Sequence, residues 1–183
     1  ENQKITPSLF AHCQNHDYCL PPTMCYHTYH QYRGQQLDEN KVVTAKGKSF
    51  RFESKYYRGL ERLWDFTIRE IVFMGTQDFV LTCRETFMQQ AFDLMNEFGL
   101  SGFCEVANDP FFVATDTASK IFSQRALELK YELRLFVAPE EPTDRSIAVA
   151  SFNYHEHFFG ETFKITQQNQ ESTLTGCVGF GLE

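Results

Sequence analysis

The chain has 183 residues, of which 42% are hydrophobic and 15% aromatic, and 19 of them are phenylalanine. This length fits one domain with a sizeable core, and the composition excludes an intrinsically disordered chain. The formal net charge of −7 argues against general affinity for nucleic acid, because neutralising phosphates needs a basic surface.

No apolar run approaches the ~18 residues that a membrane-crossing helix needs, and no signal peptide opens the chain, so we expect no membrane association. The six cysteines are too sparse for a small disulfide-stapled scaffold, and we expect free thiols in a reducing cytoplasm. We expect both ends to be cuts within a longer polypeptide, since the sequence opens on ENQKITPSLF and closes on GFGLE.

The first 24 residues are predicted to be irregular because prolines interrupt them. Cys13, His16 and Cys19 repeat at three-residue steps, but without a fourth ligand they do not favour a metal site. Residues 23–33 are dense in aromatic and histidine side chains and are expected to pack near a cleft. Residues 34–40 read as a loop.

The segment from Phe50 to Gly75 reads as two strands joined by a loop rich in lysine, arginine and tyrosine. Arg51 and Glu53 would share one face of the first strand, and Phe66 and Glu70 one face of the second. If the strands pair, one cleft gains a guanidinium, two carboxylates and an aromatic plane, which suits a nucleotide and a small charged substrate. The same alternation is also typical of a half-solvated sheet.

The clearest helix spans residues 77–98, because apolar side chains recur there at three- and four-residue steps. Thr76 can cap its start, and Gly99 can end it. A shorter helix is predicted near residues 117–126. Strands are predicted at 102–108, 128–137, 146–154, 162–166 and 173–181. This order indicates a single α+β domain over residues 1–183, with helices flanking a mostly antiparallel sheet.

Several segments resemble the catalytic core of class II aminoacyl-tRNA synthetases. FRFE at 50–53, followed by Arg62-x3-Phe66-x3-Glu70, resembles the second signature motif of that class, and GCVGFGLE at 176–183 resembles the third. With MCYHTY, RLWDFTIREIVFMG, ANDPFF, ELKYELRL and SFNYHEHFFG, the resemblance narrows to amino acid:[carrier protein] ligases. These ligases are shortened relatives of the zinc-dependent, archaeal-type seryl-tRNA synthetases. The similarity runs from about Leu20 to Glu183.

This resemblance implies a zinc ion held by Cys25, Glu70 and Cys177. Two thiolates and one carboxylate are a sensible catalytic ligand set, because they leave a fourth position open. The family uses that position for the free amino group of its substrate.

The resemblance also implies nucleotide roles. Arg51 would hold the α-phosphate and the activated carboxylate, Glu53 would contact the adenine amino group, and Arg62 would reach the outer phosphates. Phe66 would stack on the adenine, and Gly179 and Gly181 would let the nucleotide approach the backbone. Magnesium is expected on the phosphates of ATP.

For the amino-acid pocket we select Glu132, Ser151 and Asn153, of which Ser151 and Asn153 alternate on one strand face. A polar pair at a sheet end remains an alternative for these two. His155 and His157 are either structural or surface residues, or take part in substrate contact or proton transfer.

The implied activity is ATP-dependent activation of a small amino acid as an aminoacyl-adenylate, followed by transfer to the phosphopantetheine thiol of an acyl or peptidyl carrier protein. The acidic balance speaks against tRNA as the acceptor, although seryl-type tRNA aminoacylation stays an alternative. Another is a non-catalytic paralogue that acts as a binding or regulatory subunit. A homodimer is expected, although the first signature motif, which forms the family's dimer interface, is not found in this sequence.

Overall fold

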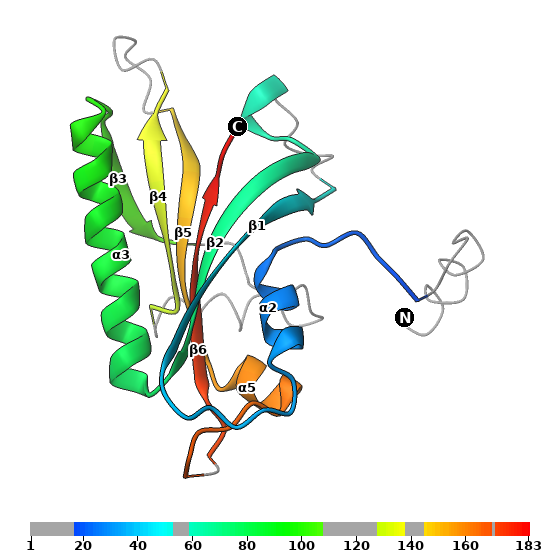
Figure 1. Ribbon diagram of the computed structural model, residues 1–183. Coiled ribbons are helices and arrows are strands. Elements are labelled where there is room, and N and C mark those ends of the chain that lie inside the picture. The colour runs from blue at the N-terminus through cyan, green and yellow to red at the C-terminus, as the bar shows by residue number, and fades with distance from the viewer. Residues whose placement is uncertain (1–16, 53–58, 108–127, 138–144, 170) are drawn as a thin grey trace, which may run out of the picture.

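The computed structural model describes residues 17–52, 59–107, 128–137, 145–169 and 171–183. In these ranges the chain forms one six-stranded antiparallel sheet with the strand order β1-β2-β6-β5-β4-β3 (Figure 1). The strands are β1 (Lys41–Phe50), β2 (Asp65–Gly75), β3 (Gly102–Val106), β4 (Lys130–Phe136), β5 (Ser146–Glu156) and β6 (Leu174–Gly181). The helices are α2 (Cys25–Gln31), α3 (Gln77–Glu97) and α5 (Phe158–Phe163), with a short 3-10 helix η1 (Gly59–Glu61). The predicted α+β class with an antiparallel sheet is confirmed.

Helices cover both sides of the sheet. The long helix α3 packs on one side against β2, β5 and β6, and α2 and α5 lie on the other side (Figure 1). Because strand side chains alternate between the two faces, each side has its own core. The core under α3 contains Phe73, Val80, Ala91, Met95, Leu133, Ala150, Phe152, Tyr154 and Val178. The core under α2 and α5 contains Cys25, Tyr29, Leu37, Val72, Met74, Phe159, Ile165 and Cys177.

Strand pairing places polar residues in two neighbouring rows on the side that α2 and α5 cover. One row crosses four adjacent strands through Glu132, Ser151, Gly179 and Glu70. The next row runs through Lys130, Asn153, Cys177 and Val72. Residues directly opposite each other on paired strands face the same side, so these rows bring distant parts of the chain together.

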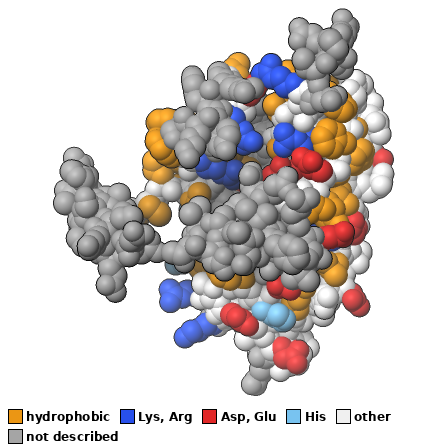
Figure 2. Space-filling view, turned by 180° about the vertical axis from the view of Figure 1, so that it is seen from behind, with side chains coloured by type: hydrophobic (Ala, Val, Ile, Leu, Met, Phe, Trp, Pro, Cys, Tyr) orange, Lys and Arg blue, Asp and Glu red, His pale blue; other side chains and the backbone are white. Residues whose placement is uncertain are grey.

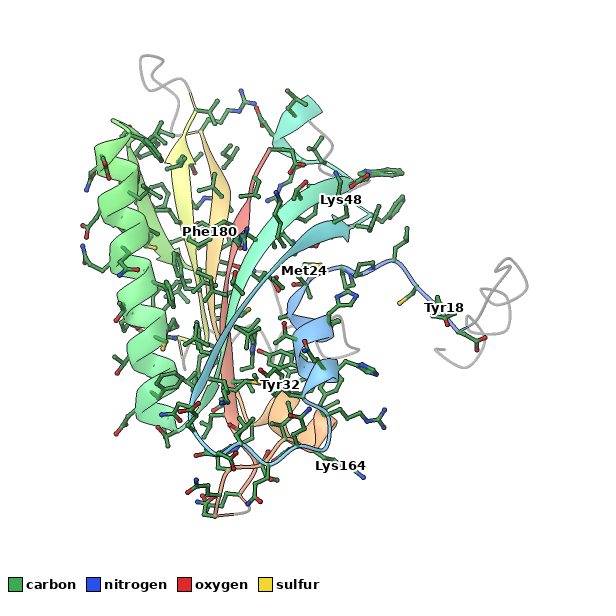
Figure 3. All side chains as sticks on the ribbon, in the orientation of Figure 1. Tyr18, Met24, Tyr32, Lys48, Lys164 and Phe180 are labelled. Atoms are coloured by element: carbon green, nitrogen blue, oxygen red, sulfur yellow. The ribbon has the colours of Figure 1, made fainter. Side chains whose placement is uncertain are left out.

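Helix α2 begins close to the sheet because a glycine lies beneath its first turn. Met24 packs over Gly47 of β1, and a Cβ added to Gly47 would come within 2.6 Å of the Met24 sulfur (Figure 3). The absence of a side chain at this position therefore lets the start of α2 approach the strand.

The predicted helix at 77–98 is confirmed almost to the residue. Thr76 caps α3, since its hydroxyl accepts a hydrogen bond from the Phe79 backbone N–H at 3.4 Å, and Gly99 follows the helix with a φ of 67°. None of the helices in the described ranges is long and apolar enough to cross a membrane. The five cysteines in these ranges are free.

Replacing Thr76 with alanine should lower the free energy of unfolding by about 1 kcal/mol, because a helix N–H loses its capping acceptor. The change is measured by urea denaturation. Thr76→Ser keeps the hydroxyl and should match the parent protein within a few tenths of a kcal/mol. Equal losses in both variants would contradict a capping role.

Two sequence assignments on the sheet were wrong. The first strand of the hairpin is Lys41–Phe50, so Arg51 follows its end rather than lying within it. Three of the four exposed positions of this edge strand are polar (Thr44, Lys46 and Lys48), so the strand shows no run of apolar residues that would mark it in the sequence. The strand predicted at 162–166 is instead the end of α5 and an isolated bridge at Thr166, because the phenylalanines of FFGETF pack as a helix on α2.

The sequence reading also missed α2 within residues 23–33, although the expectation that this stretch packs near the site is met. The strands predicted at 102–108, 128–137, 146–154 and 173–181 correspond to β3, β4, β5 and β6. The helix predicted near residues 117–126 lies outside the described residues. So do Cys13 and His16, two of the three residues that repeat at three-residue steps near the start of the chain.

Candidate functional site

Three side chains from distant parts of the chain meet on the α2 side of the sheet. Cys25 is the first residue of α2, Glu70 lies on β2, and Cys177 lies on the neighbouring strand β6. Their candidate ligand atoms all lie within 4.8 Å of one another, and all three residues are buried. Glu70 and Cys177 occupy adjacent rows of one sheet face, and the helix brings Cys25 over them.

Each of these side chains has a polar neighbour that orients it. The Thr23 hydroxyl donates to Glu70 Oε1 and lies 3.6 Å from Cys25 Sγ. Asn153 Nδ2 lies 3.4 Å from Cys177 Sγ and 3.3 Å from the Cys177 carbonyl oxygen, to both of which it donates. Metal ligands are commonly held by such partners.

The donor set fits a zinc ion. The second carboxylate oxygen, Glu70 Oε2, is buried, and no hydrogen-bond partner for it lies among the residues that the structure describes. A buried acceptor of this kind is costly unless a donor or a cation satisfies it. Two sulfurs and one oxygen also match the ligand types that zinc prefers at a site with an open fourth position.

Burial and crowding perturb the acidity of all three groups. A hydrogen bond between the two sulfurs lowers the pKa of Cys177 well below its usual value and raises the pKa of Cys25 well above it. Burial, with the negative charge of Cys177 as the next contribution, raises the pKa of Glu70 to about 7. Three acids forced together out of water resist full ionisation, and a divalent cation would relieve that repulsion.

Zinc affinity should therefore fall as the pH falls. Below about pH 7 Glu70 holds a proton that the metal must displace, in addition to the proton on Cys25. Each displaced proton weakens the apparent affinity by about tenfold per pH unit, so the dependence should steepen below the pKa of Glu70. Competition with a chromophoric chelator between about pH 6 and about pH 8 measures this slope. Glu70→Gln has no proton to lose and should lack the steeper segment, whereas a flat profile in the parent would contradict the assignment.

The residues predicted for the nucleotide are partly brought together next to this cluster. Arg51 follows β1 and is exposed, and its guanidinium carbon lies 5.1 Å from the centre of the Phe66 ring. Arg51 Nε donates to the Pro22 carbonyl oxygen at 3.0 Å, and the Phe50 N–H donates to the carbonyl oxygen of Pro21 at 2.9 Å. The segment leading into α2 therefore supports the arginine.

Two glycines continue the same sheet face. Gly179 pairs with Glu70, and a Cβ added there would lie 3.5 Å from the Glu70 side chain. Gly181 pairs with Ile68 one row further along. Arg62 is half-buried just after η1, and Glu53 lies outside the described residues. Lys and Arg side chains gather in the upper half of the face seen in Figure 2.

The residues selected for the amino-acid pocket share the rows of the cluster, but they are engaged with other side chains. Glu132 binds Lys130 Nζ at 3.0 Å and Arg134 Nη1 at 3.4 Å. Asn153 Nδ2 also donates to Ser151 Oγ at 3.2 Å. Asn153 therefore contacts both Ser151 on its own strand and the Cys177 sulfur on β6. Its Oδ1 is buried and has no hydrogen-bond partner within the described part of the chain.

Sequence reasoning did not identify Thr23 or Tyr29 as site residues. Thr23 lies in an irregular segment without periodicity, and Tyr29 belongs to the helix that was missed. Had the helix been predicted, its spacing would have placed Tyr29 on the same face as Cys25, four residues earlier.

No protein-family model matches the chain. It is 36% identical over 170 residues to amino acid–[acyl-carrier-protein] ligase 1 of Bradyrhizobium diazoefficiens, covering 91% of this chain and 50% of that protein. It is 31% identical over 172 residues to the type-2 serine–tRNA ligase of Methanococcus maripaludis, covering 90% of this chain and 33% of that protein. The chain therefore spans half or less of the length of these curated relatives.

Solved structures share its fold. The M. kandleri seryl-tRNA synthetase, solved in complex with A. aeolicus tRNASec, matches with a TM-score of 0.77 and 23% identity, covering 99% of this chain and 36% of that one. The Pyrococcus horikoshii seryl-tRNA synthetase, solved with ATP, matches with a TM-score of 0.67 and 12% identity, covering 92% of this chain and 37% of that one.

Proposed function

We propose that this chain, which has the class II synthetase fold and is related to the amino acid–[acyl-carrier-protein] ligases and the type-2 serine–tRNA ligases, activates a small amino acid with ATP for transfer to a carrier protein. The resemblance expected from the sequence is confirmed by these relatives; the activity is our inference. One observation supports this activity. The three possible metal ligands Cys25, Glu70 and Cys177 lie together, and Arg51 and Phe66 lie beside them.

The proposed metal is zinc, held by the two cysteine sulfurs and the Glu70 carboxylate. When bound, zinc would supply an open coordination position for the neutral α-amino group of the substrate. Thr23 and Asn153 would keep the ligand atoms in place. The buried Asn153 Oδ1 offers an acceptor near the metal for a substrate N–H or hydroxyl.

The nucleotide would lie over Gly179 and Gly181, with its adenine against Phe66 and Arg51 at the α-phosphate. Magnesium would accompany the phosphates, and Arg62 would reach the outer ones. In the first step a carboxylate oxygen of the amino acid attacks the α-phosphorus, and the bond to the departing pyrophosphate breaks. Arg51 would stabilise the charge that develops on the equatorial oxygens.

In the second step the phosphopantetheine sulfur of the carrier protein would attack the acyl carbon. The carbon–oxygen bond to the nucleotide breaks, the thiol loses its proton, and AMP leaves. The relatives named amino acid–[acyl-carrier-protein] ligases support this acceptor.

Pyrophosphate exchange, scanned over the proteinogenic amino acids with the full-length protein, tests the first step. Exchange with one small amino acid, such as glycine, alanine or serine, is expected. The mass of a co-expressed carrier protein then tests the second step, and its gain should equal one aminoacyl group. Exchange with no amino acid would remove the adenylation proposal and leave a non-catalytic paralogue as the better account.

Seryl-type tRNA aminoacylation is the second candidate. It is supported by the type-2 serine–tRNA ligases among the relatives and by the neighbouring structure solved with a tRNA. The net charge of −7 favours the carrier protein instead. Charging total tRNA and a purified carrier protein in parallel separates the two acceptors.

We further propose that the protein is a cytoplasmic homodimer. The free thiols of the described residues are compatible with a reducing compartment. Light scattering of the full-length protein measures its oligomeric state.

A further inference from the structure

His155 occupies an irregular point of the sheet next to the three-residue cluster. Tyr154 pairs with Gly176 and Glu156 with Thr175, so His155 is the extra residue of a β-bulge in β5. Glu156 has a φ of 51°, a left-handed conformation that is costly for a residue with a side chain. Asn153 pairs with Cys177, and His155 lies two residues further along β5, so the imidazole faces the same side of the sheet as the cluster.

Both ring nitrogens of His155 lie near polar atoms. Nδ1 lies 3.1 Å from the Tyr29 hydroxyl, and Nε2 lies 3.8 Å from Cys177 Sγ. The aromatic ring of Phe159 holds both rings, since Tyr29 stacks on it with centroids 4.4 Å apart and His155 meets it edge-on at 4.9 Å. Tyr29 is fully buried, so its hydroxyl is fixed in place.

The chemistry of the sulfur decides where the imidazole proton lies. A metal-bound cysteine is a thiolate without a proton, so a bare Nε2 would point a lone pair at negative charge. A hydrogen on Nε2 avoids this, and in the neutral imidazole it leaves Nδ1 as an acceptor for the Tyr29 hydroxyl. The Tyr29 oxygen lies 3.1 Å from Nδ1 and 3.4 Å from the Gly176 carbonyl oxygen, so its single hydrogen can be directed at the nearer acceptor.

We propose that His155 is a positioning residue for the metal centre: Tyr29 fixes its tautomer, and its Nε2–H donates to the Cys177 sulfur. This inference rests on the proposed metal site. With Asn153 Nδ2 at 3.4 Å, two N–H donors then converge on one sulfur. Zinc with two thiolates and one carboxylate carries a net charge of −1. Donors on Cys177 withdraw charge from its sulfur, and the metal stays electrophilic enough to bind a neutral amine.

Cobalt(II) substitution tests the proposal without an activity assay, because sulfur-to-cobalt charge-transfer bands report the electron density on the thiolates. His155→Leu should move these bands to longer wavelength and weaken cobalt and zinc binding about 10- to 100-fold. His155→Gln restores an N–H near the position of Nε2 and should recover most of both properties. Tyr29→Phe keeps the stacked ring but removes the hydroxyl, and should shift the bands in the same direction by less.

The matched control is His157→Leu, two residues away, where Nδ1 lies 3.0 Å from the Ser172 carbonyl oxygen on the exposed surface. Its spectrum and metal affinity should equal those of the parent.

The outcomes separate the role of His155 from the existence of the metal site. If the parent protein binds no cobalt, the metal site itself fails. If the parent binds cobalt, and if His155→Leu and Tyr29→Phe both show the same charge-transfer bands and metal affinity as the parent, the role of His155 is refuted and the metal site stands. If His155→Gln is as impaired as His155→Leu, the ring matters only for packing. Should His155→Leu not fold, the near-isosteric Tyr29→Phe decides the question.

Discussion

Replacing Cys177 with serine is expected to remove zinc binding and amino-acid activation together. Cys177 is buried at the centre of the cluster and has the lowered pKa of the two thiols, so it is the sulfur most ready to bind a metal. A serine hydroxyl is a poor zinc ligand. If metal coordination supplies several kcal/mol of substrate orientation, exchange should fall by about three orders of magnitude. Metal analysis and pyrophosphate exchange on the same sample measure both effects.

Cys104→Ser is the matched control. Cys104 lies half-buried on β3 on the opposite face of the sheet, against the α3 core, and burial raises its pKa to about 11. Its replacement should leave the zinc content unchanged and exchange within about twofold, since it packs on the side of the sheet that α3 covers. A zinc-free Cys177→Ser protein that still activates amino acids would sink the metal's role in substrate binding.

Arg51→Ala should abolish most adenylate formation while leaving zinc in place. A charged donor aimed at a developing oxyanion is worth about 100- to 1,000-fold in rate, and Arg51 is the proposed donor at the α-phosphate. Arg51→Lys keeps the charge but not the planar fork, so only partial recovery is expected. The measurements are kcat and KM for ATP in the exchange assay, with metal content determined in parallel.

Arg69→Ala provides the comparison on the same hairpin. Arg69 lies one residue before Glu70 and therefore points to the opposite face of β2, where it donates to the Thr44 hydroxyl at 3.2 Å. The Arg69→Ala substitution removes the same charge as Arg51→Ala from the same hairpin. Its rate of pyrophosphate exchange should nevertheless stay near that of the parent protein. If both substitutions slow exchange equally, the loss reflects the net charge of the hairpin and not a contact of Arg51 with the α-phosphate.

Local sequence patterns predicted the regular elements with strong periodicity. Helix α3 was visible because its apolar residues recur at helical steps between Thr76 and Gly99. Strand β1 was misplaced because it is an edge strand with one side towards solvent, so lysines replace the apolar residues there. Helix α2 was missed because it is only 7 residues long and rich in aromatic and histidine side chains, which have weak helix propensity.

The candidate site could not have been assembled from spacing. Cys25, Glu70 and Cys177 share no local pattern, and only the family resemblance grouped them before strand pairing brought them together. The same resemblance could not indicate that Asn153 donates to Cys177 or that an imidazole nitrogen of His155 lies near the same sulfur. Such contacts depend on the register in which β5 and β6 pair, which single-sequence periodicity does not encode.

The short segment from Pro21 to Cys25 contacts both the proposed metal site and the proposed nucleotide site. At one end its carbonyl oxygens hold Phe50 and Arg51, and at the other it provides a metal ligand. Fixing either end restricts the other, so metal and nucleotide should bind with positive linkage. By thermodynamic reciprocity, a nonhydrolysable ATP analogue must tighten zinc binding by the same factor by which zinc tightens the analogue. The strand-to-helix connection would then act as a tether that makes amine selection and phosphate chemistry a single cooperative event.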